Sequence, residues 1–174
     1  MLFAFLSGRR KAAFRYPVGP APRTAVLGPW FREPRGAQLR VFSSGWCVEA
    51  GKFAPAAIAA TREQLLALAE GAAPALTHAL IVIGRVGDPL LTAAERERLW
   101  RAFHVPMFEQ IVGDRGEVLA AECEAHDGLH IEAPGITWTG YKVEDGLCAC
   151  GRKTPRLTPA GSAERVRAAA VYAR

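Results

Sequence analysis

Two stretches of the chain combine the apolar spacing of a helix with the capping signals of a helix start. In ATREQLLALAEGA (60–72) leucines recur along one face, and Thr61 precedes the first turn as an N-cap. In LTAAERERLWRAF (91–103) Thr92 and Glu95 have the spacing of a capping box, in which each side chain binds the other residue's backbone N–H. The sequence therefore predicts a helix over each of these two stretches.

Short apolar runs and alternating apolar and polar residues predict the strands. THALIVIG (77–84) is a continuous apolar run, as expected for a central buried strand, and AQLRVFSSGWCVEAGKF (37–53) alternates well enough for a strand pair about the Ser43–Gly45 turn. Further extended segments are predicted at 105–113, at 116–124 and twice within 129–144. The amphipathic stretch AERVRAAAVYAR at the C-terminus predicts a last helix.

The order of these elements predicts an α/β or α+β fold, with a mixed sheet, a central βαβ unit and flanking helices. The 174 residues suit a single domain with a substantial core. We expect four parts within it: an irregular basic segment with short extended pieces (1–37), an α/β core (38–119), a zinc-binding β lobe (120–158) and a C-terminal helix (159–174).

The net charge of +5 comes mainly from arginines near the two ends of the chain. They are scattered among prolines and glycines rather than aligned on a helix with interleaved aromatic residues, which disfavours nucleic acid as the partner. No apolar run approaches the roughly 20 residues that cross a bilayer, and the opening MLFAFL precedes its basic residues, unlike a secretory signal. We expect a cytoplasmic bacterial protein without a membrane partner.

Three of the four cysteines and two of the four histidines lie between residues 123 and 150. Thiolate and imidazole are donors that Zn²⁺ prefers, and a site closed by four of them is structural. Cys123, Cys148 and Cys150 supply three ligands, and His130 is favoured as the fourth, with His126 as its substitute. Ordinary buried thiols and a core histidine are the other interpretation. We predict a structural zinc site that stabilises the β-rich C-terminal part.

Three segments of the chain resemble adenylate-forming ligases. ALIVIGRVGDPL and the residues after it (79–113) resemble the strand of that family that ends at a GEPL turn, followed by a helix and a strand entering a YGxTE loop. AECEAHDGLHIE and CACGRKTPRL are similar to the EC…GLHI and CxCGR…PR stretches of the phenylacetate–CoA ligase and capsule-biosynthesis branch. The resemblance covers about residues 76–158 and suggests a truncated, degenerate relative of that branch.

The same resemblance shows where the chain departs from the family pattern. Members are much longer, with a Ser/Thr/Gly-rich phosphate loop and a catalytic lysine on a mobile C-terminal domain, and this chain shows no such loop. The adenine-contacting turn survives only as Gly87, Asp88 and Pro89, a weak nucleotide site. IVGDRGE (111–117) replaces YGxTE and lacks its aromatic, hydroxyl and correctly spaced acid. The resemblance implies that the zinc ligands are kept, namely Cys123, His130, Cys148 and Cys150.

We therefore favour a zinc-stabilised, non-catalytic protein derived from an adenylate-forming ligase, acting as a binding or accessory module. One alternative is an enzyme: a partial ligase completed by a partner chain, or a hydrolase using Glu117, Glu122 or His126 beside the metal. Another is a nucleic-acid binder built on a zinc ribbon. A protein partner or a homo-oligomer is expected for a fragment of a larger fold. Aromatic candidates for that contact, or else core residues, are Trp30, Phe31 and Trp46.

Overall fold

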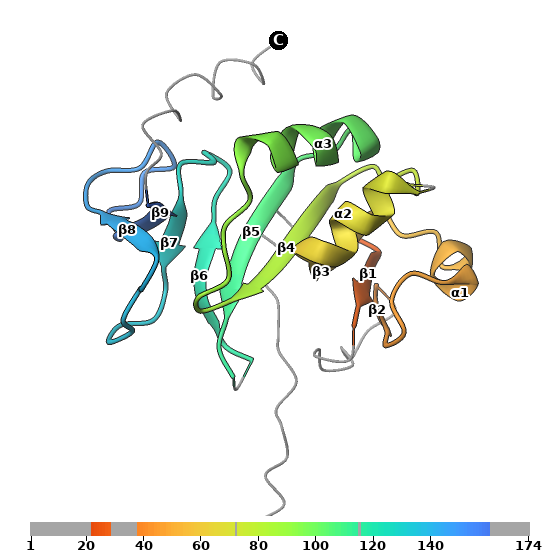
Figure 1. The fold of residues 1–174 in the computed structure, drawn as a ribbon, viewed down its shortest axis with the longest axis horizontal. Helices are drawn as coiled ribbons and strands as arrows, with labels where there is room; N and C mark the ends of the chain where they lie inside the picture. The colour runs from red at the N-terminus through yellow and green to blue at the C-terminus, as the bar shows by residue number, and fades with distance from the viewer. Residues whose placement is uncertain (1–21, 29–37, 72, 115, 161–174) are drawn as a thin grey trace, which may run out of the picture.

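The computed structural model describes residues 22–28, 38–71, 73–114 and 116–160, which build a nine-stranded mixed sheet with three helices (Figure 1). In chain order the elements are β1 (Thr24–Leu27), β2 (Leu39–Phe42), α1 (Val48–Lys52), β3 (Ala57–Thr61), α2 (Arg62–Glu70), β4 (Ala79–Arg85), α3 (Ala93–Phe103), β5 (Met107–Val112), β6 (Val118–Glu122), β7 (Leu129–Ile131), β8 (Tyr141–Glu144) and β9 (Arg156–Pro159). The prediction of a mixed α/β fold is confirmed.

Across the sheet the strands run in the order β2-β1-β3-β4-β5-β6-β7-β9-β8. The first five pair in parallel, and we call them the parallel half. The other four pair antiparallel, starting with β6 against β5, and we call them the antiparallel half. Helices α2 and α3 lie side by side on one face of the parallel half (Figure 1).

Helices α2 and α3 begin at the capping residues that the sequence indicates, Thr61 as an N-cap and the Thr92–Glu95 pair as a capping box, and in the structure both starts are capping boxes. Thr61 accepts a hydrogen bond from the backbone N–H of Gln64, and the Gln64 side chain accepts one from the Thr61 N–H. Thr92 and Glu95 form the same reciprocal pair at the start of α3. The α3 helix ends at His104, whose left-handed backbone turns the chain toward β5.

Four of the five strands of the parallel half, namely β1, β3, β4 and β5, are buried on both faces, as parallel strands usually are, whereas the edge strand β2 buries only Phe42. In β4, Leu80 and Val82 join the core under the helices, where they meet Leu99 of α3. The alternate residues, Ile81 and Ile83, belong to a second buried cluster on the other face of the sheet. The continuous apolar run of this strand therefore serves two cores.

The antiparallel half has shorter strands and a smaller apolar core. A bulge between Ile111 and Val112 shifts the register where β5 passes to β6. The buried residues beyond it include Leu129 of β7 and Leu157 of β9, which lie opposite each other across the β7–β9 pair. Partly buried residues from the loop before β8, among them Trp138, close this core.

The predicted strand pair over residues 37–53 is half wrong. The first strand is present as β2, but after the Gly45 turn the chain enters α1, which buries Ala50. The partner of β2 is instead β1, which lies earlier in the chain and pairs with it in parallel. Alternation within a segment shows that a strand is suitable there but not which strand it pairs with, so the pattern suggested a local hairpin.

Several other expectations meet the structure only in part. Within the segment expected to be irregular, β1 is one of the short extended pieces, and it is fully buried inside the sheet. Trp46 packs against the core under the helices. The C-terminal helix, Trp30 and Phe31 lie outside the described residues. Among the described residues, no helix combines the length and the apolar character needed to cross a membrane.

Candidate metal centre and neighbouring cavity

Cys123, His130, Cys148 and Cys150 come together in the antiparallel half, and we call them the Cys3His cluster. One potential ligand atom from each residue lies within 4.8 Å of the others. Three of the four residues are buried, and Cys150 is half-buried at the rim. A buried Cys3His group of this kind could hold a metal ion.

Three separate pieces of the antiparallel half deliver these side chains. Cys123 follows the last residue of β6, and His130 is the middle residue of β7, where it pairs with Ala121. Cys148 and Cys150 occupy the turn between β8 and β9. In this turn the Gly151 N–H donates to the Cys148 carbonyl at 2.8 Å, which folds the chain so that both sulfurs face inward.

Gly128 makes the approach between the Cys3His cluster and its neighbouring strand possible. Its φ of +84° lies in the left-handed region that favours glycine. A Cβ at this position would meet the Leu157 carbonyl oxygen at 2.7 Å, which is too close for any side chain. The turn therefore brings β7 against β9 and sets the position of His130 two residues later.

Two distances within the Cys3His cluster match those expected around a tetrahedral ion. With ligand distances of about 2.3 Å for sulfur and 2.0–2.1 Å for nitrogen, tetrahedral geometry places two sulfurs about 3.8 Å apart and a sulfur and a nitrogen about 3.5 Å apart. The Cys123 and Cys148 sulfurs are 3.7 Å apart. Cys150 Sγ lies 3.4 Å from His130 Nε2. The donor types and the distances therefore both suit a four-coordinate site.

Thr154 orients the histidine of the cluster. Its Oγ1 lies 2.7 Å from His130 Nδ1, so the other ring nitrogen, Nε2, is directed at the sulfurs. Such a partner on the far nitrogen fixes the ring and is typical of histidines that bind metals. Thr154 was not predicted as part of the site, because in the sequence it is only a hydroxyl residue in a loop.

The thiols of the Cys3His cluster differ in how readily they ionise without a metal. Burial raises the pKa of Cys123 to about 12, so a proton would stay on its sulfur at neutral pH. At the rim, the hydrogen bond from the Arg152 backbone N–H lowers the pKa of Cys150 to about 6. A bound cation would displace the proton from Cys123, because the thiolate is the form that binds metals.

The other residues considered for metal or acid–base chemistry lie elsewhere. His126 stacks on Phe108, with ring centroids 4.9 Å apart, and its Nδ1 lies 3.3 Å from a Glu122 oxygen. It is not part of the Cys3His cluster. Glu117 is exposed in the turn before β6. Glu122 is buried and engaged in an ion-pair group.

This ion-pair group joins Arg96 of α3 to two buried carboxylates, and we call it the Arg96 group. Arg96 pairs with Glu109 of β5 and with Glu122 of β6, the latter at 2.9 Å. Glu109 also accepts a hydrogen bond from the Leu91 N–H at 2.7 Å. Burial tends to raise the pKa of Glu122, but the charge of Arg96 and the hydrogen bond from His126 lower it to about 2. The sequence carries no local signal for this group.

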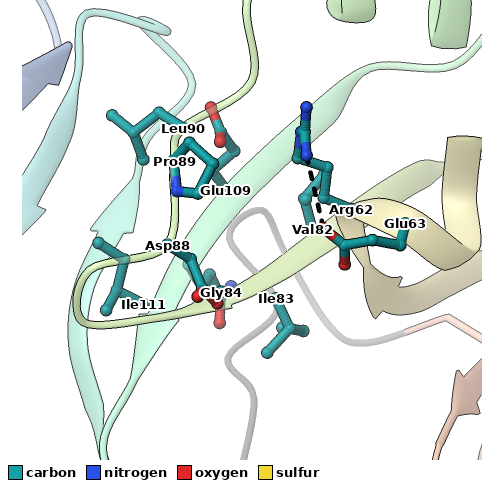
Figure 2. A pocket seen from close by; sticks show the side chains of 11 residues that line it. Arg62, Glu63, Val82, Ile83, Gly84, Asp88, Pro89, Leu90, Glu109 and Ile111 are labelled. Carbon is teal, nitrogen blue, oxygen red and sulfur yellow. Dashed lines mark hydrogen bonds and ion pairs between the residues drawn. The ribbon is translucent and has the colours of Figure 1, made fainter.

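A cavity of about 240 Å³ lies at the carboxyl end of β4, and we call it the strand-end cavity. Figure 2 shows Arg62 and Glu63 of α2 on one side and the loop after β4 on the other. Its lining residues from β4, the following loop and β5 are Val82, Ile83, Gly84, Asp88, Pro89, Leu90, Glu109, Gln110 and Ile111. The carboxyl ends of parallel strands are where α/β sheets usually bind ligands.

Two of the three residues of the predicted nucleotide turn line this cavity. Asp88 and Pro89 contribute to its wall, and Gly87 shapes the turn before them with a φ of +94°. One oxygen of Asp88 accepts a hydrogen bond from the Arg85 N–H at 2.8 Å. The Asp88 carboxylate therefore closes its own turn, and Glu109, the other carboxylate of the inner wall, pairs with Arg96.

Searches against protein-family models and curated protein sequences give no match. Among solved structures, the chain is similar to an open conformation of 2-hydroxyisobutyryl-CoA ligase in complex with 2-HIB-AMP and CoA, with a TM-score of 0.57 and 15% sequence identity. The similarity covers 81% of this chain and 45% of that ligase, so the chain spans less than half of its length. At this identity the likeness shows the fold alone.

Two further CoA and acid ligases show weaker similarity. The first is a benzoate CoA ligase from Burkholderia xenovorans LB400, with a TM-score of 0.43 and 11% identity, and the similarity covers 78% of this chain and 31% of that one. The second is the R395G mutant of coronafacic acid ligase from Pectobacterium brasiliense, with a TM-score of 0.41 and 14% identity, and the similarity covers 75% of this chain and 29% of that one. By name, two of these three structural neighbours are CoA ligases and the third is an acid ligase.

Proposed function

We propose that this chain is a zinc-stabilised, non-catalytic module derived from an adenylate-forming ligase of the phenylacetate–CoA ligase branch. The observation that carries the proposal is the Cys3His cluster, in which four donors of the right types lie within 4.8 Å of one another and two of their distances match tetrahedral coordination. Three thiolates and one imidazole would leave no open position for water. The metal would therefore act structurally, by tying the end of β6, the middle of β7 and the turn before β9 together.

The residues that line the strand-end cavity support the non-catalytic part of this proposal. Its two inner carboxylates, Asp88 and Glu109, are held by the Arg85 N–H and by Arg96. IVGDRGE stands where a ligase would carry YGxTE. At about 240 Å³ the cavity is also smaller than the roughly 300–1,000 Å³ of typical ligand pockets. It suits a small ligand, or part of a larger one, and this would be the binding role of a cytoplasmic accessory module.

Metal analysis of the purified protein tests the zinc site. We expect about one zinc per chain, and we expect Cys148→Ser to lose most of it. Cys47→Ser is the matched control, because Cys47 lies on the N-terminal side of α1 and is not in the Cys3His cluster. A protein without zinc that also fails to bind added zinc or cobalt would contradict the proposal.

ATP-dependent pyrophosphate exchange tests the non-catalytic part. We expect no exchange above background with a panel of aromatic and short-chain acids, whether or not the protein contains zinc. A thermal-shift screen with nucleotides and acyl-adenylate analogues measures binding at the strand-end cavity separately. Exchange by the chain alone would favour the alternative of a working ligase.

The second candidate function is a partial ligase completed by a partner chain. The observation that favours it is that the fold matches only 45% of the 2-hydroxyisobutyryl-CoA ligase. This candidate predicts that pyrophosphate exchange appears only when a second protein is present. Reconstitution with proteins encoded beside this one, each assayed alone and in the mixture, separates it from the non-catalytic module.

A further inference from the structure

The strand β8 forms one outer edge of the sheet in the described part of the chain (Figure 1). It pairs with β9 on one side, and no strand of the described residues pairs with its other side. Large apolar residues are exposed here: Val143 is 47% exposed within β8, and Leu147 in the following turn is 67% exposed. A sheet edge that exposes apolar residues, here Val143 and Leu147, is suited to pairing with another strand.

The charge pattern of β8 identifies which strand it fits. In an antiparallel pair, two residues that lie directly opposite each other are either hydrogen-bonded to each other or not, and the two kinds of pair alternate along the strands. When a strand pairs in this way with its own copy about a twofold axis, the alternation is kept only if one residue lies opposite itself, so this residue lies on the axis. For the four residues of β8, only Lys142 or Val143 at the axis leaves three residues overlapping. A centre at Lys142 would place like charges opposite each other, which is destabilising.

A centre at Val143 makes the edge self-complementary. Lys142 then faces Glu144 of the second copy, Glu144 faces Lys142 of the second copy, and the two Val143 side chains meet on the axis. Lys142 and Glu144 already pair within one strand at 2.9 Å, which shows that both side chains lie along the same face of the strand. Pairing would add two cross-strand ion pairs to these groups.

The opposite edge of the sheet lacks this property. In β2, Phe42 is buried, and Leu39 and Val41 pack against the second core cluster. A copy of β2 centred on Arg40 would place two arginines opposite each other. A copy centred on Val41 would place Arg40 opposite the buried Phe42, so neither register of β2 sets opposite charges against each other. Of these two sheet edges in the described residues, only β8 is self-complementary in charge.

We propose that β8 pairs antiparallel with β8 of a second copy of this chain, about a twofold axis at Val143. The two nine-stranded sheets would then continue into one another, with Leu147 of each copy beside the new strand pair. A four-residue strand buries less than the about 800 Å² per partner of a standard stable interface. The dimer therefore dissociates on dilution, and its population depends on protein concentration.

Sedimentation velocity of the full chain over a hundredfold range of concentration tests the proposal. We expect the apparent mass to rise from 18.7 kDa toward twice that value. Because residue 143 faces itself across the axis, Val143→Lys and Val143→Glu should each weaken self-association at least tenfold. A 1:1 mixture of the two variants should associate again, because a lysine then faces a glutamate.

Controls separate loss of the interface from loss of the fold. Val48→Lys places the same lysine on α1, at a residue that is 68% exposed and distant in sequence from β8, and should associate like the wild type. Thermal unfolding should be nearly unchanged in all three variants, because Val143 is half exposed in one copy. A wild-type protein that keeps the mass of one copy at every concentration would overturn the proposal, since a short, lysine-bearing edge also serves to prevent pairing. It would also be overturned by unaffected association of Val143→Lys, or by a mixture that fails to associate.

Discussion

The parallel and antiparallel halves of the sheet differ in what covers their strands. Residues of β1, β3, β4 and β5 are almost all buried, on both faces of the sheet. By contrast, β8 has no buried residue, and β7 is only three residues long. The parallel half has enough apolar area to be stabilised by burial, whereas the antiparallel half combines a small core with the Cys3His cluster.

This difference bears on what can stabilise the short strands of the antiparallel half. The antiparallel half combines short strands with a small apolar core, and small domains of this kind usually need disulfides or metals. The Cys3His cluster brings side chains from residues 123 to 150 to one point, where a bound ion would tie these segments together without long strands. Between the halves, the Arg96 group links α3 and β5 to the last residue of β6. The two halves should therefore respond differently to metal removal and to loss of apolar packing.

Metal removal should have the largest effect and should divide the two halves. Zinc contributes roughly 10–16 kcal/mol to small zinc-finger peptides, and we expect a loss of several kcal/mol, confined to the antiparallel half. Hydrogen exchange after chelation should show lost protection for amides of β7 and β9, while β3 and β4 stay protected. Equal loss in both halves would contradict this division, and added zinc should restore protection.

Removing the positive charge of Arg96, which links the two halves, should cause the next largest loss of unfolding free energy. Arg96→Met would leave Glu109 and Glu122 buried without their cation, and losing one partner of a buried ion pair costs roughly 3–5 kcal/mol. Arg98→Met is the matched control on the same helix, because Arg98 pairs with Glu70 at an exposed site and should cost about 1 kcal/mol or less. Urea unfolding of both variants measures the difference in unfolding free energy. Equal losses would show that the Arg96 group contributes no more stability than the exposed Arg98 ion pair.

Loss of packing in the parallel half should destabilise the protein without touching the metal. Leu99 is fully buried in the core under the helices, and Leu99→Ala should cost about 3 kcal/mol of unfolding free energy. Zinc content should stay at the wild-type level, because the Cys3His cluster lies in the other half. Val48→Ala, at an exposed position, is the control and should change little. Loss of zinc from Leu99→Ala would show that the halves are not independent.

The sequence predicted best what depends on neighbouring residues. The N-cap Thr61, the Thr92–Glu95 capping box and the buried strand β4 follow from patterns a few residues long. What depends on distant pairing was missed, as with β1 as the partner of β2, or kept an alternative, as with His126 beside the favoured His130. The position of His130 follows from its pairing with Ala121 across the sheet, which no local pattern contains. The Arg96 group could not be predicted either, since its three members come from separate elements.

The cap of α3 should have the smallest effect and tests how far local structure supports the parallel half. Thr92 accepts a hydrogen bond from the Glu95 N–H and also donates its hydroxyl proton to the Glu95 carboxylate. Thr92→Ala should therefore cost about 1 kcal/mol of unfolding free energy, measured by urea unfolding. Thr137→Ala, at an exposed loop residue of the antiparallel half, should cost less. If Thr92→Ala costs nothing, packing alone holds the first turn of α3, and this cap adds no stability to the parallel half.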